Sequence, residues 1–461
     1  MQNLFSKSVI IFSGLVFLSL LALNLSNYVY YTGSPGGIFY HYAIPLILAA
    51  AMFFSLRLSV PSRIVISLCL VSIVFGLYAT ELYLSFTNTS PKDRAAEAGG
   101  KSFDGRTKIQ VITDLRREGI DAYPVMRAKS MLIENADASL VPALNVRGEG
   151  FLPLASVPLK TVVSCNESGQ WLIYKSDIHG FHNPPGAWQT APVEIAVVGD
   201  SFAHGSCVQS EQNTAALLRN RFGNVLNLGI SGFGPLTELV SLREYAAPLK
   251  PKTVVWFYFE GNDLIEDLVF EKRSELLMRY YRDEDFTQGL IGHSADISKY
   301  LKVYLDERLV EAMNRVDDPN EYLMDFLTLF HLRETFGLGA VSLGVLDGGG
   351  SKGDLEMFAN ILDKARRSVE SWDGKFYFVY LPESPRYFAA ARDNDIRDHL
   401  RNEVLKQVAA LKIPLIDLHP SFAAQPDPRR MFQYPGSHYS PEGYKVAADA
   451  IGRVLSDFSA R

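Results

Sequence analysis

This 461-residue sequence has no excess of basic residues, and its first 85 residues contain almost no charged residues of either sign. Lysine and arginine number 45 against 51 aspartates and glutamates, which gives a net charge of −6. This balance argues against the clustered basic face or tail with which proteins hold nucleic acid. An internal repeat of solenoid period is also missing, so a repeat architecture is not expected.

Three long apolar runs occupy the nearly uncharged N-terminal part, over residues 9–25, 38–56 and 64–84. Each approaches the ~20 residues that a helix needs to cross a bilayer. Buried helices of a soluble protein are the alternative, but three such runs in succession leave no polar face for water. The pattern therefore predicts a three-helix membrane anchor over residues 1–85, with Pro45 as a kink in the second helix.

The few cations beside these runs predict their orientation. Lys7 precedes the first helix, and Arg57 and Arg63 lie in the loop between the second and the third, whereas the loop over residues 26–37 has no cation. Because positive charge stays on the cytoplasmic side, the N-terminus is expected inside a cytoplasmic (inner) membrane, and everything after three crossings is expected in the periplasm or otherwise outside the cytoplasm. A cleaved signal peptide is the alternative, but "LALNLSNY" contains no small-residue cleavage site. Glu81 is expected where it reaches the lipid headgroups.

Cysteine is the next scarce residue type, with three in the whole chain. Cys69 falls within the third apolar run, which leaves Cys165 and Cys207 as the only pair beyond the membrane. In an oxidising compartment an even pair is able to form a disulfide, and two unrelated buried thiols are the alternative.

Residues 86–190 predict a linker followed by an accessory region. Residues 88–105 are rich in serine, lysine, alanine and glycine, as in a linker that leaves the membrane. The accessory region ends in "SDIHGFHNPPGAW", whose glycine and prolines force turns. This stretch carries Asp177, His179 and His182, but neither a cysteine pair nor an HExxH helix accompanies them, so a surface or pocket-lining loop is favoured over a metal site.

Apolar strand-like segments then alternate with helical ones, a pattern typical of a parallel sheet covered on both faces. The expected strands are residues 194–198, 225–228, 253–259, 375–381 and 413–417. The expected helices are residues 213–222, 236–247, 355–372 and 397–411, with a last helix that begins after its N-cap, Ser440. Residues 264–353 are too long for one crossover and are expected to form an inserted cap.

Four short motifs follow these strands: "GDSF" with Ser201, "NLGISGFG" with Gly229 and Gly232, "EGND" with Asn262, and "GSHYSPEGY" with His438. In their order and spacing they resemble the SGNH or GDSL hydrolase superfamily. The resemblance extends from about residue 193 to the C-terminus. It implies a flavodoxin-like, three-layer α/β/α domain over residues 191–461 and requires no cofactor or metal.

The resemblance also implies roles for these residues. Ser201 is the expected nucleophile and His438 its general base, and the expected oxyanion-hole donors are the amides of Ser201 and Gly232 and the side chain of Asn262. Each residue taken alone has a simpler reading: Ser201 as a helix cap, Gly232 as a turn glycine, and His438 as a partner of a backbone carbonyl. Four motifs in the family order favour catalysis over these readings.

The sequence departs from the family pattern at two places. Glu260 replaces the usual first glycine of the third motif, which affects the expected shape of the pocket. Pro435 occupies the position of the acid that normally orients the histidine. Asp417 is one candidate replacement, and a Ser–His dyad without an acid is favoured over it. His204, about one helical turn after Ser201, is expected to be a substrate contact or an exposed polar residue.

Three functions are compatible with this reading. The favoured one is a membrane-anchored extracytoplasmic serine hydrolase that cleaves O-acyl esters, such as O-acetyl groups, on glycans or lipids. The second is an O-acetyltransferase that modifies a surface polysaccharide and depends on a multi-spanning membrane acyltransferase as its partner. The third is a non-catalytic polysaccharide-binding scaffold.

Overall fold

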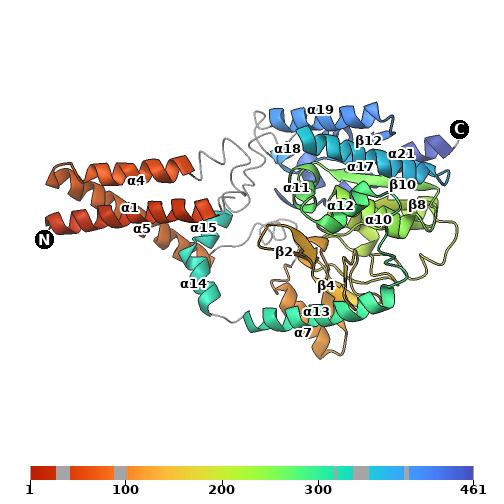
Figure 1. The fold of residues 1–461 in the computed structure, drawn as a ribbon, viewed down its shortest axis with the longest axis horizontal. Coiled ribbons are helices and arrows are strands. Elements are labelled where there is room, and N and C mark those ends of the chain that lie inside the picture. The colour runs from red at the N-terminus through yellow and green to blue at the C-terminus, as the bar shows by residue number, and fades with distance from the viewer. Residues whose placement is uncertain are drawn as a thin grey trace. The chain divides into compact units, whose positions relative to one another are not determined.

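The chain folds into two compact units in the computed structural model (Figure 1), one built from Met1–Ser90 with Asp317–Gly349 and the other from Pro91–Val316 with Gly350–Arg461. The residues described by the structure are 2–26, 42–87, 100, 102–315, 319–335, 352–388 and 394–459. The accessory region therefore shares a unit with the α/β domain, whereas the expected insertion is divided between the two units. Most of the expected linker at 88–105 and of the glycine-rich stretch at 337–353 lies outside the described residues.

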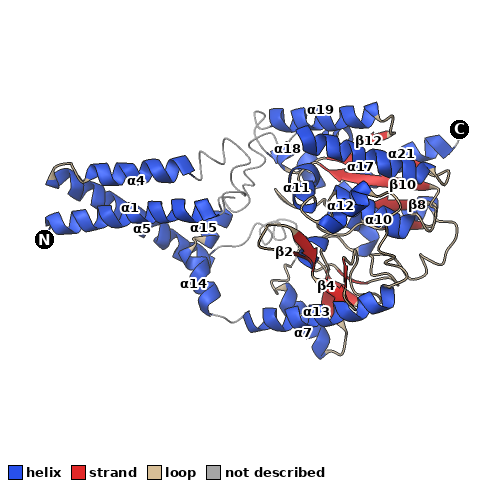
Figure 2. Ribbon diagram, viewed as in Figure 1, coloured by secondary structure: helices blue, strands red, loops and turns tan. Residues whose placement is uncertain are grey.

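A five-stranded sheet forms the centre of the second unit (Figure 2). Its strands are β8 (Ile195–Val198), β9 (Val225–Asn227), β10 (Thr253–Phe259), β11 (Lys375–Leu381) and β12 (Leu415–Asp417). They lie in the order β12-β11-β10-β8-β9 and are all parallel, so the predicted parallel sheet is confirmed. This is the flavodoxin-like order, in which ligands bind where the strand order reverses, beside the first strand, β8.

Helices cover both faces of this sheet because its side chains alternate between two cores. On β10, Val254, Trp256 and Tyr258 belong to one core, and Val255 and Phe257 belong to the other. The first face is covered by α10 (Pro235–Ser241), α17 (Lys352–Glu370) and α19 (Asn394–Ala410). The second is covered by α9 (Thr214–Phe222), α20 (Leu418–Ala423) and α21 (Pro441–Ser459). The predicted α/β/α layers are therefore present.

The accessory region packs into the first of these cores. Its elements are α7 (Lys108–Arg117), η2 (Ala128–Met131), a sheet of β1 (Ala122–Pro124), β6 (Thr161–Val163) and β7 (Ile173–Lys175), and the pairs β2 (Leu132–Glu134) with β3 (Leu140–Pro142) and β4 (Leu144–Val146) with β5 (Glu149–Phe151). Part of the insertion follows β10 as η5 (Asp263–Asp267), α11 (Leu268–Glu271), α12 (Glu275–Arg282) and α13 (Ser294–Arg315). Leu301 of α13 and Val111 of α7 belong to the same core as the sheet, so these segments form one body with it.

Among the described residues of the first unit, two helices are long and apolar enough to cross a membrane, α1 (Gln2–Ser26) and α5 (Val60–Thr87), whereas three were expected. Between them α4 (Ile44–Ser55) has 12 residues. Residues 27–41, which precede it, lie outside the described part of the chain. Pro45 lies in the first turn of α4, directly after the helical residues 42–43, and the kink expected there stays a prediction.

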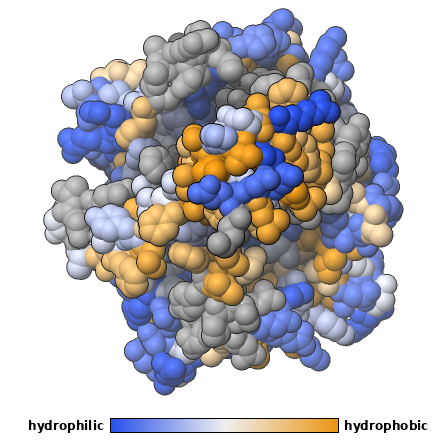
Figure 3. Space-filling model, turned by 90° about the vertical axis from the view of Figure 1, so that its left-hand side faces the viewer, coloured by the Kyte–Doolittle hydropathy of each residue, from blue (hydrophilic) through white to orange (hydrophobic). Residues whose placement is uncertain are grey.

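Large apolar side chains cover the outside of these helices. Phe12, Val65 and Phe75 are more than half exposed, and the end-on view shows such hydrophobic side chains in orange (Figure 3). The prediction for Glu81 is wrong, because its carboxylate is buried and accepts hydrogen bonds from the backbone of His331 (2.9 Å) and Leu332 (2.8 Å).

These contacts come from α15 (Phe330–Thr335), which together with α14 (Pro319–Leu327) packs on α5 within the first unit. This part of the insertion therefore belongs to the first unit and not to the unit that contains the sheet.

Candidate active site

The turn after β8 presents Ser201 at the carboxyl edge of the sheet. Gly199 makes the turn, and a Cβ atom there would lie 2.8 Å from the Cβ of Phe257, so only glycine fits. Asp200 then caps the short helix α8 (Ser201–His204), since its carboxylate accepts the Phe202 N–H at 2.9 Å. Ser201 itself is the first residue of α8 and is 7% exposed. The strand–turn–helix therefore fixes the position of its hydroxyl.

The loop before α21 brings His438 to this hydroxyl. Ser440 caps α21, because its hydroxyl accepts the Gly443 N–H at 3.1 Å, as the sequence predicts. The Nε2 atom of His438 lies 2.9 Å from Oγ of Ser201, although 237 positions separate the two residues in the sequence. The structure thus brings together the two residues expected to act as nucleophile and base.

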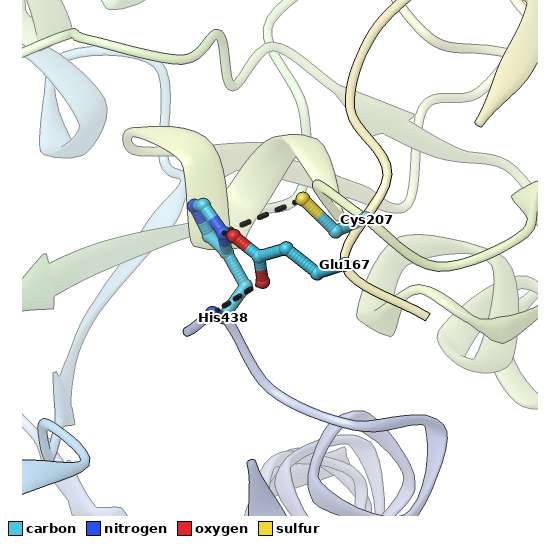
Figure 4. Close-up of side chains that lie close together, drawn as sticks. All are labelled: Glu167, Cys207 and His438. Carbon is cyan, nitrogen blue, oxygen red and sulfur yellow. Dashed lines mark hydrogen bonds and ion pairs between the residues drawn. The ribbon is translucent and has the colours of Figure 1, made fainter. Parts of the chain in front are cut away.

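A third residue, Glu167, lies on the other side of the imidazole (Figure 4). One carboxylate oxygen is 2.9 Å from Nδ1 of His438, and the other accepts the His438 backbone N–H at 2.8 Å. Because a carboxylate has no proton to donate, this contact places the ring proton on Nδ1 and leaves Nε2 as an acceptor for the Ser201 hydroxyl. The expected Ser–His dyad is therefore corrected to a serine–histidine–glutamate arrangement.

Asp417, the acid proposed from the sequence, has a different role. Its side chain is paired with Arg401 and accepts the His419 N–H at 3.0 Å, which caps α20. Its strand β12 is at the edge of the sheet, three strand spacings from β8, or about 14 Å at 4.8 Å per spacing. Asp417 is thus placed too far away to orient His438.

The charges around His438 act in opposite directions on its pKa. Burial is the largest single influence and lowers the pKa, whereas the Glu167 carboxylate raises it through both its charge and its hydrogen bond. Asp200 adds to the rise and Arg127 opposes it, and the resulting pKa lies above the usual value of 6.5. The imidazole at this position is therefore more basic than a free histidine.

The three expected oxyanion-hole donors follow neighbouring strands. Gly232 follows β9, Ser201 follows β8 and Asn262 follows β10, and these strands are adjacent and parallel, so their carboxyl ends meet at one edge. Gly232 has a φ of +83°, which favours glycine. Within the described residues, neither the Gly232 N–H nor the Asn262 side chain has a hydrogen-bond partner. Both groups are free to bind an anionic oxygen.

Buried carboxyl groups hold the two loops that carry these donors. Asp263 accepts the Phe259 N–H at 2.7 Å and fixes the turn that contains Asn262. Glu271 accepts the N–H groups of Gly234 (2.8 Å) and Leu236 (2.9 Å), which fixes the loop after Gly232. Burial raises the pKa of Asp263 well above its usual range and that of Glu271 to about 7.

Replacing Asn262 with alanine tests this site. We expect kcat for ester hydrolysis to fall about 100- to 1,000-fold with little change in KM, because the amide would stabilise charge that develops only in the transition state. Steady-state kinetics measures both constants, and Asn360→Ala, an exposed asparagine of α17, is the matched control. An Asn262→Ala variant with the kcat of the wild type would remove Asn262 from the oxyanion hole.

Two further expectations for polar residues need correction. Glu260 does not shape the pocket through its own side chain, because its buried carboxylate pairs with Arg386 at 2.6 Å and accepts the Glu383 N–H at 2.7 Å. His204 is neither exposed nor a substrate contact. It is fully buried and hydrogen-bonded to the hydroxyl of Tyr174 at 3.0 Å, because the short helix α8 turns this residue into the core.

The loop around Asp177 is buried in part, but residues 184–186 are exposed and His179 lines a cavity, so the expected surface or pocket-lining loop is confirmed for these residues. The Asp177 carboxylate accepts hydrogen bonds from the backbone of His179 (2.8 Å) and Phe181 (2.9 Å) and from the indole of Trp188 (2.6 Å). His182 is also buried and stacks on Tyr174. These contacts compensate the buried carboxylate and give the segment a structural role.

Cys165 and Cys207 form a disulfide, with Cα atoms 5.1 Å apart. Sγ of Cys207 lies 3.5 Å from Nδ1 of His438, so Glu167, Cys207 and His438 bring three metal-ligand atoms together (Figure 4). A metal ion would need a cysteine thiolate, and the disulfide leaves none. The carboxylate and the imidazole are already paired with each other, so this donor set fits a catalytic acid–histidine pair better than a metal site.

Glu167 is the residue that sequence reasoning missed. It lies 271 positions before His438, in a loop without a family motif. One signal was present: a disulfide between Cys165 and Cys207 brings residues near 165 close to the nucleophile's turn, and Glu167 is the acid in that loop.

Comparison with known proteins adds a family match. Residues 197–446, more than half of the chain, match the model of the GDSL-like Lipase/Acylhydrolase family. No curated protein gives a significant match. The assignment to a family therefore depends on the family model.

Solved structures similar to this chain include a lipase/acylhydrolase from Enterococcus faecalis (14% identity, covering 57% of this chain and 94% of that one, TM-score 0.32). Others are a putative G-D-S-L lipolytic protein from Desulfitobacterium hafniense (16%, 57% and 99%, TM-score 0.31) and the acetyl xylan esterase AlAXEase (12%, 57% and 100%, TM-score 0.33).

Proposed function

Because this chain belongs to the GDSL-like Lipase/Acylhydrolase family, we propose that it is a membrane-anchored serine hydrolase that cleaves O-acyl esters on glycans or lipids outside the cytoplasm. The observation that supports this proposal most is the alignment of Ser201, His438 and Glu167, with 2.9 Å on each side of the imidazole. A serine hydroxyl is a weak nucleophile until a positioned base removes its proton.

In the first half of the proposed reaction, Ser201 attacks the ester carbonyl while its proton moves to Nε2 of His438. Glu167 stabilises the imidazolium that forms and keeps the ring oriented. The negative oxygen of the tetrahedral intermediate binds to the amides of Ser201 and Gly232 and to the side chain of Asn262. The imidazolium then protonates the leaving alcohol, and the acyl group stays on Ser201.

In the second half, His438 takes a proton from water, which attacks the acyl group and releases the free acid.

The raised pKa of His438 makes this residue a stronger base for both steps. Only the neutral imidazole accepts a proton, so kcat/KM is expected to rise with pH through a pKa above 6.5.

Contacts within the first unit support a site outside the cytoplasm. Arg63 donates to the Asn3 side chain at 2.8 Å and Ser67 to the Ser6 carbonyl at 3.2 Å, so α1 and α5 begin at the same end and run parallel. The chain between them must return to that end, which also carries Arg57. Positive charge at this end favours a cytoplasmic location for it, and the end of α5 then lies outside. The Cys165–Cys207 disulfide is consistent with an oxidising compartment.

An acetate-release experiment tests this function against transfer. The full-length protein in detergent is incubated with an O-acetylated glycan, with p-nitrophenyl acetate and with an unacetylated acceptor glycan. The proposal predicts free acetate from the esters at a rate that does not depend on the acceptor. Acetyl groups on the acceptor would instead make the protein an O-acetyltransferase. Neither product, with an intact fold, would favour a binding scaffold.

A further inference from the structure

The loop that carries Glu167 is joined covalently to the loop that follows the nucleophile. Glu167 lies between β6 and β7, two positions after Cys165. Cys207 follows α8, six positions after Ser201. The Cys165–Cys207 disulfide therefore connects the segment with the acid to the segment with the serine. Glu167 and Cys207 both lie beside the imidazole of His438 (Figure 4).

Apart from the two hydrogen bonds of Glu167 to His438, several noncovalent contacts of this loop lie within the loop itself or the accessory region. Ser164 N–H donates to the Leu172 carbonyl and Leu172 N–H to the Cys165 carbonyl, both at 2.9 Å, which closes the base of the β6–β7 hairpin. The Asn166 side chain donates to the Asp104 carbonyl at 2.9 Å, within the accessory region. Tyr174, in β7 and seven positions after Glu167, is hydrogen-bonded through its hydroxyl to Nε2 of His204 at 3.0 Å. The disulfide attaches the loop covalently to the nucleophile's segment, two positions before the acid.

Resting on the function proposed above, we propose that the Cys165–Cys207 disulfide positions Glu167 against His438, so that the enzyme becomes fully active only after this disulfide has formed. The acid must stay within hydrogen-bond distance of Nδ1, and a displacement of about 1 Å in a catalytic constellation costs about 100-fold in rate. A chain still in a reducing compartment would therefore have a loosely held acid and a slow active site.

Reduction has a second effect at the same atom. A dithiol reductant transfers two electrons and two protons, so the S–S bond breaks, both cysteines become thiols, and the dithiol becomes a disulfide. Because Sγ of Cys207 lies 3.5 Å from Nδ1 of His438, the freed thiol would compete with Glu167 for that nitrogen. Loss of the disulfide therefore weakens the Glu167–His438 contact in two ways: the acid is held less firmly, and the Cys207 thiol competes with it.

The experiment compares the full-length wild type with the Cys165→Ala/Cys207→Ala double variant in detergent, with p-nitrophenyl acetate as substrate. We expect the double variant to lose about 100-fold in kcat with little change in KM. We also expect the acidic limb of its kcat/KM profile to move to lower pH, because a displaced carboxylate no longer raises the pKa of His438. Dithiothreitol should slow the wild type but not the double variant. Cys69→Ser, which removes the free cysteine in α5, is the matched control.

The outcomes separate this inference from the proposed function. A double variant with the kcat and acidic limb of the wild type overturns the inference. A slower variant whose acidic limb is unmoved, with a lower melting temperature, also overturns it, because the disulfide would then be only structural. If the oxidised wild type hydrolyses no ester and its Ser201 does not react with a fluorophosphonate, the proposed function itself fails.

Discussion

The Ser201→Ala variant is expected to lose about a millionfold in kcat for ester hydrolysis, the loss typical when the nucleophile of a serine hydrolase is removed. The hydroxyl lies 2.9 Å from the base, and no second nucleophile is available to the same imidazole nitrogen among its described contacts. Alanine keeps the helix α8 and removes one oxygen. Hydrolysis of p-nitrophenyl acetate, followed by absorbance, measures the loss.

Ser371→Ala is the matched control for this prediction, because Ser371 is an exposed serine after α17. It should keep the activity of the wild type. Circular dichroism of both variants shows whether the fold is retained. A folded Ser201→Ala variant within about tenfold of the wild-type kcat would mean that hydrolysis does not pass through this serine.

The second large effect is expected for Glu167→Gln, which should lower kcat about 10,000-fold. Glutamine has the shape of glutamate, and its carbonyl is able to accept the backbone N–H of His438, as one Glu167 oxygen does at 2.8 Å in the wild type. It carries no charge to stabilise the imidazolium, and its NH₂ group favours the tautomer with the proton on Nε2. That tautomer cannot accept the proton of Ser201.

The pH dependence gives this variant a second signature. Glu167 raises the pKa of His438, whereas burial lowers it. When the carboxylate is removed and burial stays, the pKa falls, so the acidic limb of kcat/KM is expected to shift to lower pH. Asp417→Asn is the matched control: asparagine also caps helices well, and Asp417 does not contact His438, so kcat should change less than tenfold or so. Equal losses in the two variants would contradict the assignment of Glu167.

Much of the fold could be predicted from the sequence because its signals are local. Strands β10 and β11 are continuous apolar runs, as expected for strands buried on both faces, and their ends agree with the prediction. The position of α4 was less predictable, since the apolar run that contains it has no internal feature except Pro45. Proline is compatible both with a kink and with the first turn of a helix, and in the structure Pro45 lies in the first turn of α4.

The active-site residues also differ in how far they could be predicted from the sequence. Ser201 and His438 stand in motifs beside predictable elements, whereas the identity of the acid depends on which segments meet in space. Asp417 ends a predicted strand, but the strand order places it at the sheet edge, and that order is not written in any local pattern. Glu167 comes from the accessory region outside the family match, so the packing of that region decided its role.

Covalent labelling by a fluorophosphonate probe tests most directly whether Ser201 is an activated nucleophile. The probe reacts with serine hydroxyls that a base activates, and it requires no knowledge of the natural ester. Incubation of the oxidised full-length protein should give one adduct on the peptide that contains Ser201, and the Ser201→Ala variant should give none. An unlabelled Ser201 in a folded wild-type protein, or an equal adduct in the Ser201→Ala variant, would contradict the account.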